Sequence, residues 1–267
     1  MPLAVCATPI GNLEDVTLRV LRELAEADVV LCEDTRRTRV LLQRHGISAR
    51  VVSYHEHNEA ERTAELLPRL QAGERVALVS DAGLPAINDP GARLIAAALE
   101  AGVPVTVLPG PSAVETALVA SGISAERYQF VGYLPRGAAA LRALWVELAG
   151  WPWPAVAFDS PQRLPTTLRS LAEAYPERRV AVCRELTKQF EEVVRGSASE
   201  VAEVFAEPPR GEITLVLDAW PGEGPDEDAG IAAVAELVGV GVPRRQAADL
   251  VARLTGASRN ALYRGSL

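Results

Sequence analysis

Loops rich in glycine, proline and polar residues follow several apolar runs of this sequence, and they are where chemistry could occur. They read TPIGN at 8–12, EDTR at 33–36, SDAGLP at 80–85, PGPSA at 109–113 and SPQR at 160–163. Each follows a short apolar run that predicts a buried strand. Because the carboxyl ends of parallel strands meet at one edge of a sheet, we expect the loops to converge on one cleft.

The stretch VALVSDAGLPAINDPG, residues 76–91, shows this pattern most fully. The Asp81 carboxylate beside small residues suits ribose hydroxyls or a cation, and Gly83 permits backbone torsions that a side chain would block. The PGPSA turn at a helix start offers free backbone N–H groups. Any one of these loops could be an ordinary turn. None of them has a Walker A or GxGxxG pattern, which disfavours nucleoside triphosphates and nicotinamide dinucleotides.

The elements that must position these loops alternate between strand and helix, as in parallel βαβ units. After Gly122 strands outnumber helices, which indicates a second α/β domain with a mixed sheet. An acidic, Gly/Pro-rich segment then precedes a helical tail. The expected organisation is an N-terminal α/β domain over 1–120, a second α/β domain over 121–220, an acidic linker over 221–230 and a basic helical tail over 231–267.

The composition is that of a soluble globular protein, with 267 residues, 48% hydrophobic and 23% charged. No apolar run approaches the roughly 20 residues of a membrane span, and the amino terminus lacks the basic region of a signal peptide. A cytoplasmic location without a membrane partner is therefore expected. Cys6, Cys32 and Cys183 are scattered, which predicts buried reduced thiols rather than disulfides or metal ligands.

The net charge of −8 argues against nucleic-acid binding by the whole surface, but the charge is uneven. Two short helices with helix-turn-helix spacing are expected in the tail, split at Thr255 and Gly256. Basic side chains on such a module suit phosphate contacts that position RNA. The alternative is a solvated tail that packs on the body. Within VPRRQAADLVARLTGASRNALYR, residues 242–264, a single acid, Asp249, stands against the arginines Arg244, Arg245, Arg253, Arg259 and Arg264.

Several longer motifs run from about Leu3 to the carboxyl end: TPIGNLEDVTLRVL, ADVVLCEDTRRTRVLL, VALVSDAGLPAINDPG, LPGPSAVETAL, RYQFVGYLPR, CRELTKQFEEVVRG and RNALYR. With them the sequence resembles the tetrapyrrole-methylase-fold methyltransferases. TPIGNLED, EDTR and HNE followed by SDAG resemble the members that methylate a cytidine ribose in small-subunit ribosomal RNA, rather than the corrin-modifying ones. The resemblance implies a tetrapyrrole-methylase-like two-domain α/β fold with a cofactor cleft between the domains, and a homodimer.

The resemblance also implies an S-adenosylmethionine site in that cleft. By motif position the residues expected to line it are Pro9, Asp81, Ala82, Gly83, Leu84, Ser112 and Ala113 from the first domain and Phe158, Leu186 and Ile213 from the second. The sequence departs from the family pattern at Leu84, where threonine is common. Asp159 and Gln162 stand where the family usually has Glu and His. Gln162 lacks a titratable group, so this position is not expected to take a proton.

A ribose hydroxyl is a weak nucleophile that must lose its proton, and a carboxylate, a histidine or a water chain could accept it. Glu33 and Asp34 end the second predicted strand at the cleft edge. We expect one of them to be the acceptor or to anchor the substrate. The alternative is that EDTR caps the following helix, where acids satisfy first-turn N–H groups. Both can hold.

The sequence HEHNE contains His55, His57, Asn58 and Glu59. Two histidines one residue apart could bind a metal from one face of a strand, but no third ligand has a convincing spacing. A substrate-side loop in which His55 and Asn58 face RNA, or an N-cap at Asn58, is the preferred interpretation, and no metal is expected.

Arginines at strand and helix ends are further candidates for RNA phosphates. Arg36, Arg163 and Arg184 have this placement. Glu185 is expected to be a salt-bridge partner for them rather than a catalyst.

The sequence therefore predicts an enzyme that uses S-adenosylmethionine to methylate a cytidine 2′-hydroxyl in small-subunit ribosomal RNA, free or in the small subunit. A second interpretation keeps the fold but methylates a small molecule such as a corrin or porphyrin precursor, and the basic tail argues against it. A third is a non-catalytic RNA-binding or cofactor-sensing protein, and the intact SDAG and EDTR loops argue against that.

Overall fold

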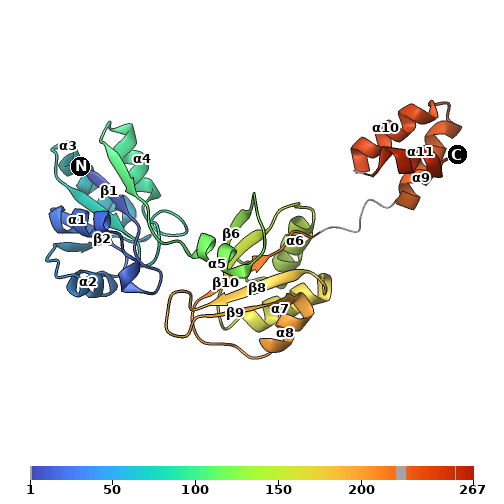
Figure 1. Ribbon diagram of the computed structural model, residues 1–267. Helices are drawn as coiled ribbons and strands as arrows, with labels where there is room; N and C mark the ends of the chain where they lie inside the picture. Colours follow the sequence, from blue (N-terminus) through green and yellow to red (C-terminus); the bar gives the residue numbers. More distant parts are fainter. Residues whose placement is uncertain (1, 221–226, 256) are drawn as a thin grey trace.

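The computed structural model describes residues 2–220, 227–255 and 257–267. An α/β unit is followed by a second α/β unit and then by a separate cluster of helices (Figure 1). Residues 221–226, the larger part of the expected acidic linker, lie outside the described residues. Residues 227–230, which were also expected in the linker, form the start of a helix instead.

The first unit is built on a five-stranded sheet with the order β3-β2-β4-β1-β5. Every pairing in it is parallel, with Leu3 opposite both Val76 and Val105. Strands that are covered on both faces read as continuous apolar runs, which is the pattern of the sequence here. The strands are β1 (Leu3–Cys6), β2 (Val29–Cys32), β3 (Val51–Ser53), β4 (Val76–Val79) and β5 (Val105–Leu108).

Helices cover both faces of this sheet. On one face of the sheet, Val20 and Leu41 pack on Ala4 and Val30. On the other face, Leu66 and Leu94 pack on the strand side chains that point the opposite way. Successive strand side chains point to opposite faces, so each strand contributes to both cores. The first face carries α1 (Leu18–Glu26) and α2 (Thr35–Arg44); the second carries α3 (Glu59–Gln71) and α4 (Ala92–Glu100). A 3-10 turn, η1 (Leu13–Asp15), precedes α1.

The second unit has a mixed five-stranded sheet, as the sequence predicts, with the order β6-β7-β10-β8-β9. Only β6 and β7 pair in parallel within it. Its strands are β6 (Gln129–Tyr133), β7 (Ala155–Asp159), β8 (Arg179–Arg184), β9 (Glu192–Ser197) and β10 (Ile213–Leu217). The helices α6 (Ala138–Ala149), α7 (Leu164–Ala174) and α8 (Ala198–Val204) share one core with it.

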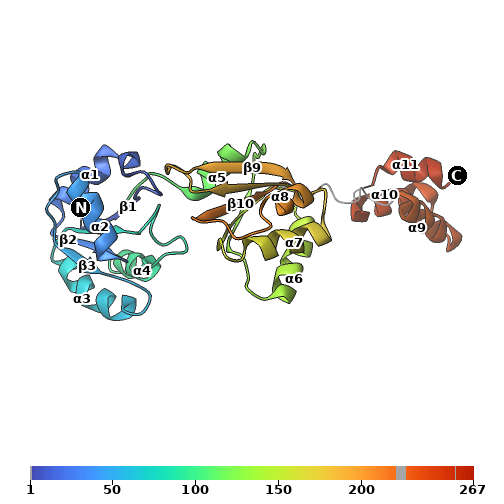
Figure 2. The same cartoon turned by 90° about the horizontal axis from the view of Figure 1, so that it is seen from below.

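Helix α5 (Ala113–Ser121) covers the opposite face of the second sheet, as Figure 2 shows. Its Val114 and Ala117 pack with Val156, Ala181 and Val216 of that sheet. The expected division near residue 120 falls inside this helix. The packing instead places the division before α5. A helix belongs to the unit whose core buries its apolar face, and the apolar face of α5 is buried by the second sheet.

The C-terminal helices have a hydrophobic core of their own. They are α9 (Glu227–Gly239), α10 (Arg244–Thr255) and α11 (Arg259–Gly265), and their core includes Val234, Val251 and Leu262. Gly230 allows close approach, because a Cβ there would lie 2.6 Å from Leu262 Cδ2. No helix among the described residues is long and apolar enough to span a bilayer. Cys6, Cys32 and Cys183 are buried, as the sequence predicts, and each is a free thiol in the structure.

Candidate active site

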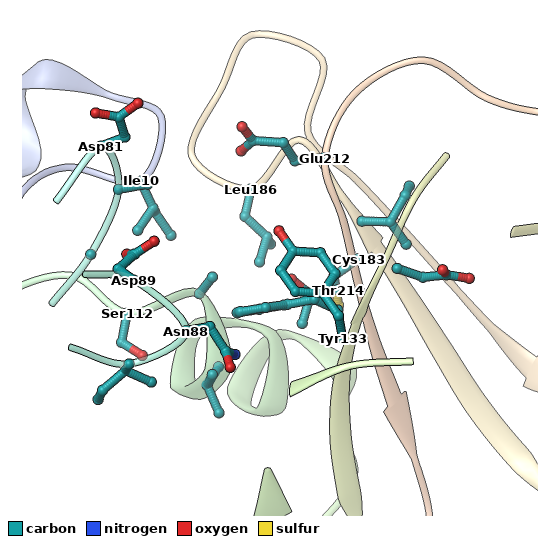
Figure 3. Close-up of a pocket in the computed structure, with 18 of the residues that line it drawn as sticks. Ile10, Asp81, Asn88, Asp89, Ser112, Tyr133, Cys183, Leu186, Glu212 and Thr214 are labelled. Atoms are coloured by element: carbon teal, nitrogen blue, oxygen red, sulfur yellow. The ribbon is translucent and has the colours of Figure 1, made fainter. Parts of the chain in front are cut away.

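A cavity of about 730 Å³ lies between the two α/β units, at the carboxyl ends of β2 and β4 (Figure 3). Small-molecule sites typically have about 300–1,000 Å³ and combine apolar walls with a few polar groups. A smaller cavity of about 310 Å³ adjoins it under the TPIGN loop. Ile10, Arg37, Asp81, Ala82 and Glu212 line both cavities.

The residues expected to bind the cofactor are brought together here. Pro9 lines the smaller cavity, and the others line the larger one: Asp81, Ala82, Gly83, Leu84, Ser112, Ala113, Phe158, Leu186 and Ile213. They come from both units, so the cleft that the resemblance implies is present. The Leu84 departure adds an apolar side chain to the wall rather than a hydroxyl.

The TPIGN and SDAG loops are joined by a short β-bridge. Thr8 and Gly83 exchange backbone hydrogen bonds of 2.8 and 3.0 Å, and Thr8 Oγ1 donates to the Ser80 carbonyl at 3.0 Å. Gly11 packs against the second unit, since a Cβ there would lie 2.5 Å from Lys188 Cγ and 2.8 Å from the Leu186 carbonyl oxygen. The bridge and this close approach hold the floor of the cleft in one geometry.

Asp81 occupies the junction of the two cavities. Its Oδ1 accepts a hydrogen bond of 3.0 Å from the Asp34 backbone N–H, and its Oδ2 lies 3.7 Å from Arg37 Nε. The Arg37 side chain is 61% exposed, so the pairing leaves the carboxylate open to a ligand. Asp81 therefore presents its carboxylate group at the junction of the two cavities.

Glu33 and Asp34 diverge in the structure. Glu33 is exposed and lines the cavity. Asp34 instead caps α2: its Oδ1 accepts from the Arg36 backbone N–H at 2.8 Å, and its Oδ2 accepts from the Arg36 guanidinium at 2.7 Å. These bonds lower the pKa of Asp34 to about 2. The structure thus brings Glu33 into the site, while the Asp34 carboxylate is engaged as a cap with Arg36 as its partner.

The loop that joins β4 to α4 contributes a carboxylate that sequence reasoning missed. Asp89 lines the cavity, and burial, with Glu33 nearby, raises its pKa to about 6. Ala86 and Asn88 have positive φ values of 68° and 58°, and Gly91 has 138°. The segment NDPG reads as a turn in sequence, so its chemistry is visible only once the turn is seen to face the cavity.

The HEHNE segment holds that loop in place rather than facing the cavity. Glu59 Oε1 accepts from the Gly91 and Arg93 backbone N–H groups at 3.1 and 3.3 Å, and from the buried Tyr54 hydroxyl at 3.1 Å. It therefore satisfies orphan donors at the start of α4.

The two residues of this segment that were expected to face RNA bond to one another. Asn58 Oδ1 accepts from the His55 backbone N–H at 2.8 Å, and Asn58 Nδ2 lies 3.3 Å from His55 Nε2. Asn58 stands at the N-cap position of α3 without making a side-chain cap bond. Neither residue lines either cavity described above.

The second unit supplies an aromatic wall. Phe158 meets Tyr133 edge to face at 5.5 Å and Phe130 at 5.0 Å between ring centroids. Tyr133 is 66% exposed and faces the cavity opposite Asp89 (Figure 3). Partial desolvation, with Glu212, Asp89 and Glu33 nearby, raises its pKa. Such a wall suits a flat ring.

A charged cluster closes the cleft from the second unit. Lys188 Nζ donates to Glu185 Oε1 at 2.8 Å and to Glu212 Oε2 at 3.0 Å. Glu185 also accepts from the Glu212 backbone N–H at 2.9 Å. Glu185 is thus an ion-pair partner as expected, but its partner is Lys188 rather than one of the arginines.

Two arginines that were expected to hold phosphates are bound within the protein. Arg163 donates to Asp159, which is buried, and to the Leu134 carbonyl at 3.1 Å. Arg184 donates to Glu192 at 2.9 Å and to the Arg210 carbonyl at 3.1 Å. Arg36 is 87% exposed beside Asp34. Of these three arginines, Arg36 has the most exposed side chain, although its guanidinium is also paired with Asp34.

Asp159 and Gln162, where the sequence departs from the family pattern, have different environments in the structure. Asp159 accepts from the Ser160 backbone N–H at 2.8 Å and from Thr167 Oγ1 at 2.6 Å, besides Arg163. Gln162 is exposed and lines neither cavity. The shorter aspartate is therefore a buried anchor for the loop after β7.

The arginines of the tail lie on α10 and α11 and at their ends. Arg245, Arg253 and Arg264 are exposed, Arg259 pairs with Asp249, and Arg244 is half-buried. The helices around them have a core of small apolar residues. The three C-terminal helices are thus held together by apolar packing, and most of their arginines lie on the surface.

Comparisons with known proteins agree with this architecture. Residues 2–202 match the family described as Tetrapyrrole (Corrin/Porphyrin) Methylases, and residues 224–265 match the family described as RsmI C-terminal HTH domain. The chain is 43% identical over 265 residues to "Ribosomal RNA small subunit methyltransferase I" of Mesorhizobium japonicum, covering 98% of this chain and 90% of that protein. It is 47% identical over 255 residues to the protein of the same name in Mycobacterium bovis, covering 94% and 88%.

Solved structures share the fold at lower identity. Uroporphyrin-III C-methyltransferase from Thermus thermophilus, complexed with S-adenosyl homocysteine, superposes with a TM-score of 0.56 at 23% identity, covering 83% of this chain and 97% of that one. A conserved hypothetical protein from Aeropyrum pernix superposes with a TM-score of 0.63 at 21% identity, covering 99% and 94%. By its family match and its relatives, the chain belongs to the tetrapyrrole methylases and, within them, to the group of ribosomal RNA small subunit methyltransferase I proteins.

Proposed function

We propose that this protein transfers a methyl group from S-adenosylmethionine to the ribose 2′-hydroxyl of a cytidine in small-subunit ribosomal RNA. The observation that carries the proposal is the cavity between the two α/β units, lined from both sides by the expected cofactor positions. The names of the relatives support an RNA substrate, and the arginine-bearing C-terminal helices support an anionic one.

The residues of the cavity fit the proposed cofactor. Its acidic side, with Asp81 and Glu33, suits a ligand with a positive centre, and its apolar side, which includes Phe158 and Leu186, suits a flat purine ring. When bound, S-adenosylmethionine supplies a methyl group on a sulfonium cation. A hydrogen bond that the Asp81 carboxylate accepts from the cofactor would contribute about 1.5–3 kcal/mol to the binding free energy.

The protein's part in the reaction is then largely positioning. Attack on a methyl group must be in line with the bond that breaks, and holding both reactants in place removes much of the entropic barrier. The Thr8–Gly83 bridge fixes one wall, and the close packing of Gly11 on the second unit fixes the other wall relative to it. These contacts fix the position of the two walls relative to each other.

Recruitment of RNA falls to exposed arginines. Arg36 lies at the start of α2, and the tail adds Arg245, Arg253 and Arg264. Phosphate contacts of this kind fix orientation without reading sequence. Arg163 and Arg184 act instead within the second unit, because their side chains are largely buried against protein partners, whereas the Arg36 side chain is exposed beside Asp34. We also propose a cytoplasmic homodimer, on the family resemblance alone.

The test is incorporation of labelled methyl groups into three substrates: small ribosomal subunits that lack the modification, their free ribosomal RNA, and a porphyrinoid precursor. We expect incorporation into ribosomal RNA, and Asp81→Ala should reduce it by weakening cofactor binding. Asp249→Ala, in the tail, is the control for cofactor binding. Incorporation into the porphyrinoid alone would favour a small-molecule methylase, and cofactor binding without turnover would favour a sensor.

A further inference from the structure

The larger cavity contains two carboxylates that form no ion pair among the described residues. Of the acids that line it, Asp81 lies beside Arg37, Asp159 is bonded to Arg163, and Glu212 to Lys188. Glu33 and Asp89 remain. A carboxylate that is already paired with a cationic side chain has its oxygens engaged and is less available to take a proton from a substrate. Glu33 and Asp89 are therefore the two candidates for the proton acceptor.

Asp89 is held in a fixed place by a strained and anchored loop. Gly91 has a φ of 138°, and a Cβ there would lie 2.9 Å from Leu78 Cδ2, so only glycine fits. Glu59 binds the Gly91 backbone N–H from α3 at 3.1 Å. Residues in sparsely populated backbone regions persist only where the surroundings hold them, and they cluster at functional sites. The loop thus presents Asp89 to the cavity in a pre-set position.

The surroundings of Asp89 suit a group that gains and loses a proton near neutrality. Burial, together with Glu33 and Asp81, raises its pKa to about 6, and a side-chain hydrogen bond with Ser80 partly opposes this. A general base works best when its pKa is close to the working pH. The charged or titratable groups that line the cavity or contact the loop of Asp89 are Glu33, Asp81, Arg37, Tyr133, Asp159, Cys183, Glu212, Glu59 and Arg93.

We propose that Asp89 takes the proton of the ribose 2′-hydroxyl during methyl transfer. The neighbouring Glu33 adjusts how readily Asp89 takes up that proton. This rests on the proposed function. In the step, the ribose 2′-oxygen forms a bond to the methyl carbon, the carbon–sulfur bond breaks with its electron pair passing to sulfur, and the hydroxyl proton passes to an Asp89 carboxylate oxygen. The proton leaves to water after product release, which restores the carboxylate.

The role of Glu33 gives the proposal a signature that a merely structural aspartate would lack. Replacing Glu33 by glutamine removes a like charge, so the pKa of Asp89 should fall. Because the base must be deprotonated to act, activity rises with pH through that pKa. The acid limb of the pH–rate profile should therefore move to lower pH in Glu33→Gln.

The experiment combines titration and kinetics on the full chain. Carboxyl resonances of the protein without ligand are followed by NMR against pH, and Asp89 is assigned by its loss in Asp89→Asn. Transfer to small ribosomal subunits is then measured against pH for the wild type, Asp89→Asn, Asp89→Glu, Glu33→Gln and Glu100→Gln. Glu100 is an exposed acid at the end of α4 and serves as the matched control.

We expect Asp89→Asn to lower kcat by about 10²–10⁴-fold while cofactor affinity and the melting temperature stay close to those of the wild type. Asp89→Glu should restore part of the rate. Glu33→Gln should move the Asp89 titration and the acid limb together to lower pH, and Glu100→Gln should move neither.

Asp89→Asn with a wild-type kcat would overturn this proposal and leave the proposed function standing. A Glu33→Gln variant that shifts the titration but not the acid limb would also overturn it. A wild-type enzyme that methylates no ribosomal RNA would defeat the proposed function, and this proposal with it.

Discussion

The cavity and the C-terminal helices of this protein carry opposite charge. The cavity is lined by Glu33, Asp81, Asp89 and Glu212, with Arg37 at its junction, whereas α10 and α11 are rich in arginine. The whole chain has a net charge of −8. An acidic protein that acts on a polyanion needs its positive charge gathered in one place, because local potential steers the encounter. Under the proposed function, the cavity binds the cofactor and the arginine-bearing helices bind the RNA.

The two regions also differ in how their charges are held. In the cleft Asp81 and Glu212 are tied to neighbouring groups, so the site is rigid. On the tail Arg245 and Arg253 are exposed, and only side-chain entropy limits their reach to phosphates. Under the proposed function, the constrained side chains lie at the site of methyl transfer, and the unconstrained ones lie where the RNA would bind.

The largest expected effect comes from removing residues 221–267. Loss of the arginine-bearing helices should lower kcat/KM for ribosomal RNA by on the order of 10²-fold, since several arginine–phosphate pairs disappear at once. The dissociation constant for S-adenosylmethionine, measured by calorimetry, should be unchanged because the cavity lies in residues before the cut. If cofactor binding were lost as well, the tail would be a structural part of the cleft, and the division of labour would be wrong.

Asp81→Ala should affect the other region alone. Removing a charge-assisted hydrogen bond of about 1.5–3 kcal/mol should raise the dissociation constant of the cofactor about 10–150-fold. RNA affinity, measured by filter binding without cofactor, should not change. Equal cofactor affinity in the variant would show that the ligand lies elsewhere.

A triple substitution of Arg245, Arg253 and Arg264 by glutamine should sharpen the picture of the tail. These side chains are exposed, so the helices should stay folded, which circular dichroism checks. RNA affinity should fall by a similar factor for all sequences, and the slope of affinity against salt should decrease by about 1 for each arginine that no longer neutralises a phosphate. A weakening confined to one RNA sequence would mean that the arginines read bases.

The smallest effect is expected for Asp249→Ala. This substitution releases Arg259 from its ion pair and removes the one acid among these arginines. RNA affinity should rise about twofold, because a surface ion pair of this kind is worth at most about 1 kcal/mol. Weaker RNA binding in the variant would mean that the pair orients Arg259 toward the RNA.

Most of the fold could be predicted from the sequence, because the apolar runs and turn residues act locally. The strands at 3–6, 29–32 and 76–79 are short, apolar and bounded by glycine or polar residues. Helix α5 shows the limit of this reasoning. Its alternation continues the pattern of the first unit, but which sheet it covers depends on packing with residues far along the chain, such as Val216.

Part of the candidate site could be predicted from the sequence, namely the residues whose position is set by a local motif alone. Strand ends place Glu33 and Asp81 at the cleft whatever the rest of the chain does. Asp89 was missed because NDPG has the composition of a turn, and neither its burial nor the nearby charge of Glu33 can be read from that local sequence. Arg163 and Arg184 were assigned to RNA because a sequence does not show which carboxylate or carbonyl will occupy a guanidinium.

The most direct test of the central claim is the identity of the methylated nucleoside. Small ribosomal subunits lacking the modification are incubated with this protein and labelled S-adenosylmethionine, and the RNA is digested to nucleosides and separated by mass spectrometry. The account predicts label in 2′-O-methylcytidine from a single site. Label on a base, or no label while the cofactor binds, would contradict it.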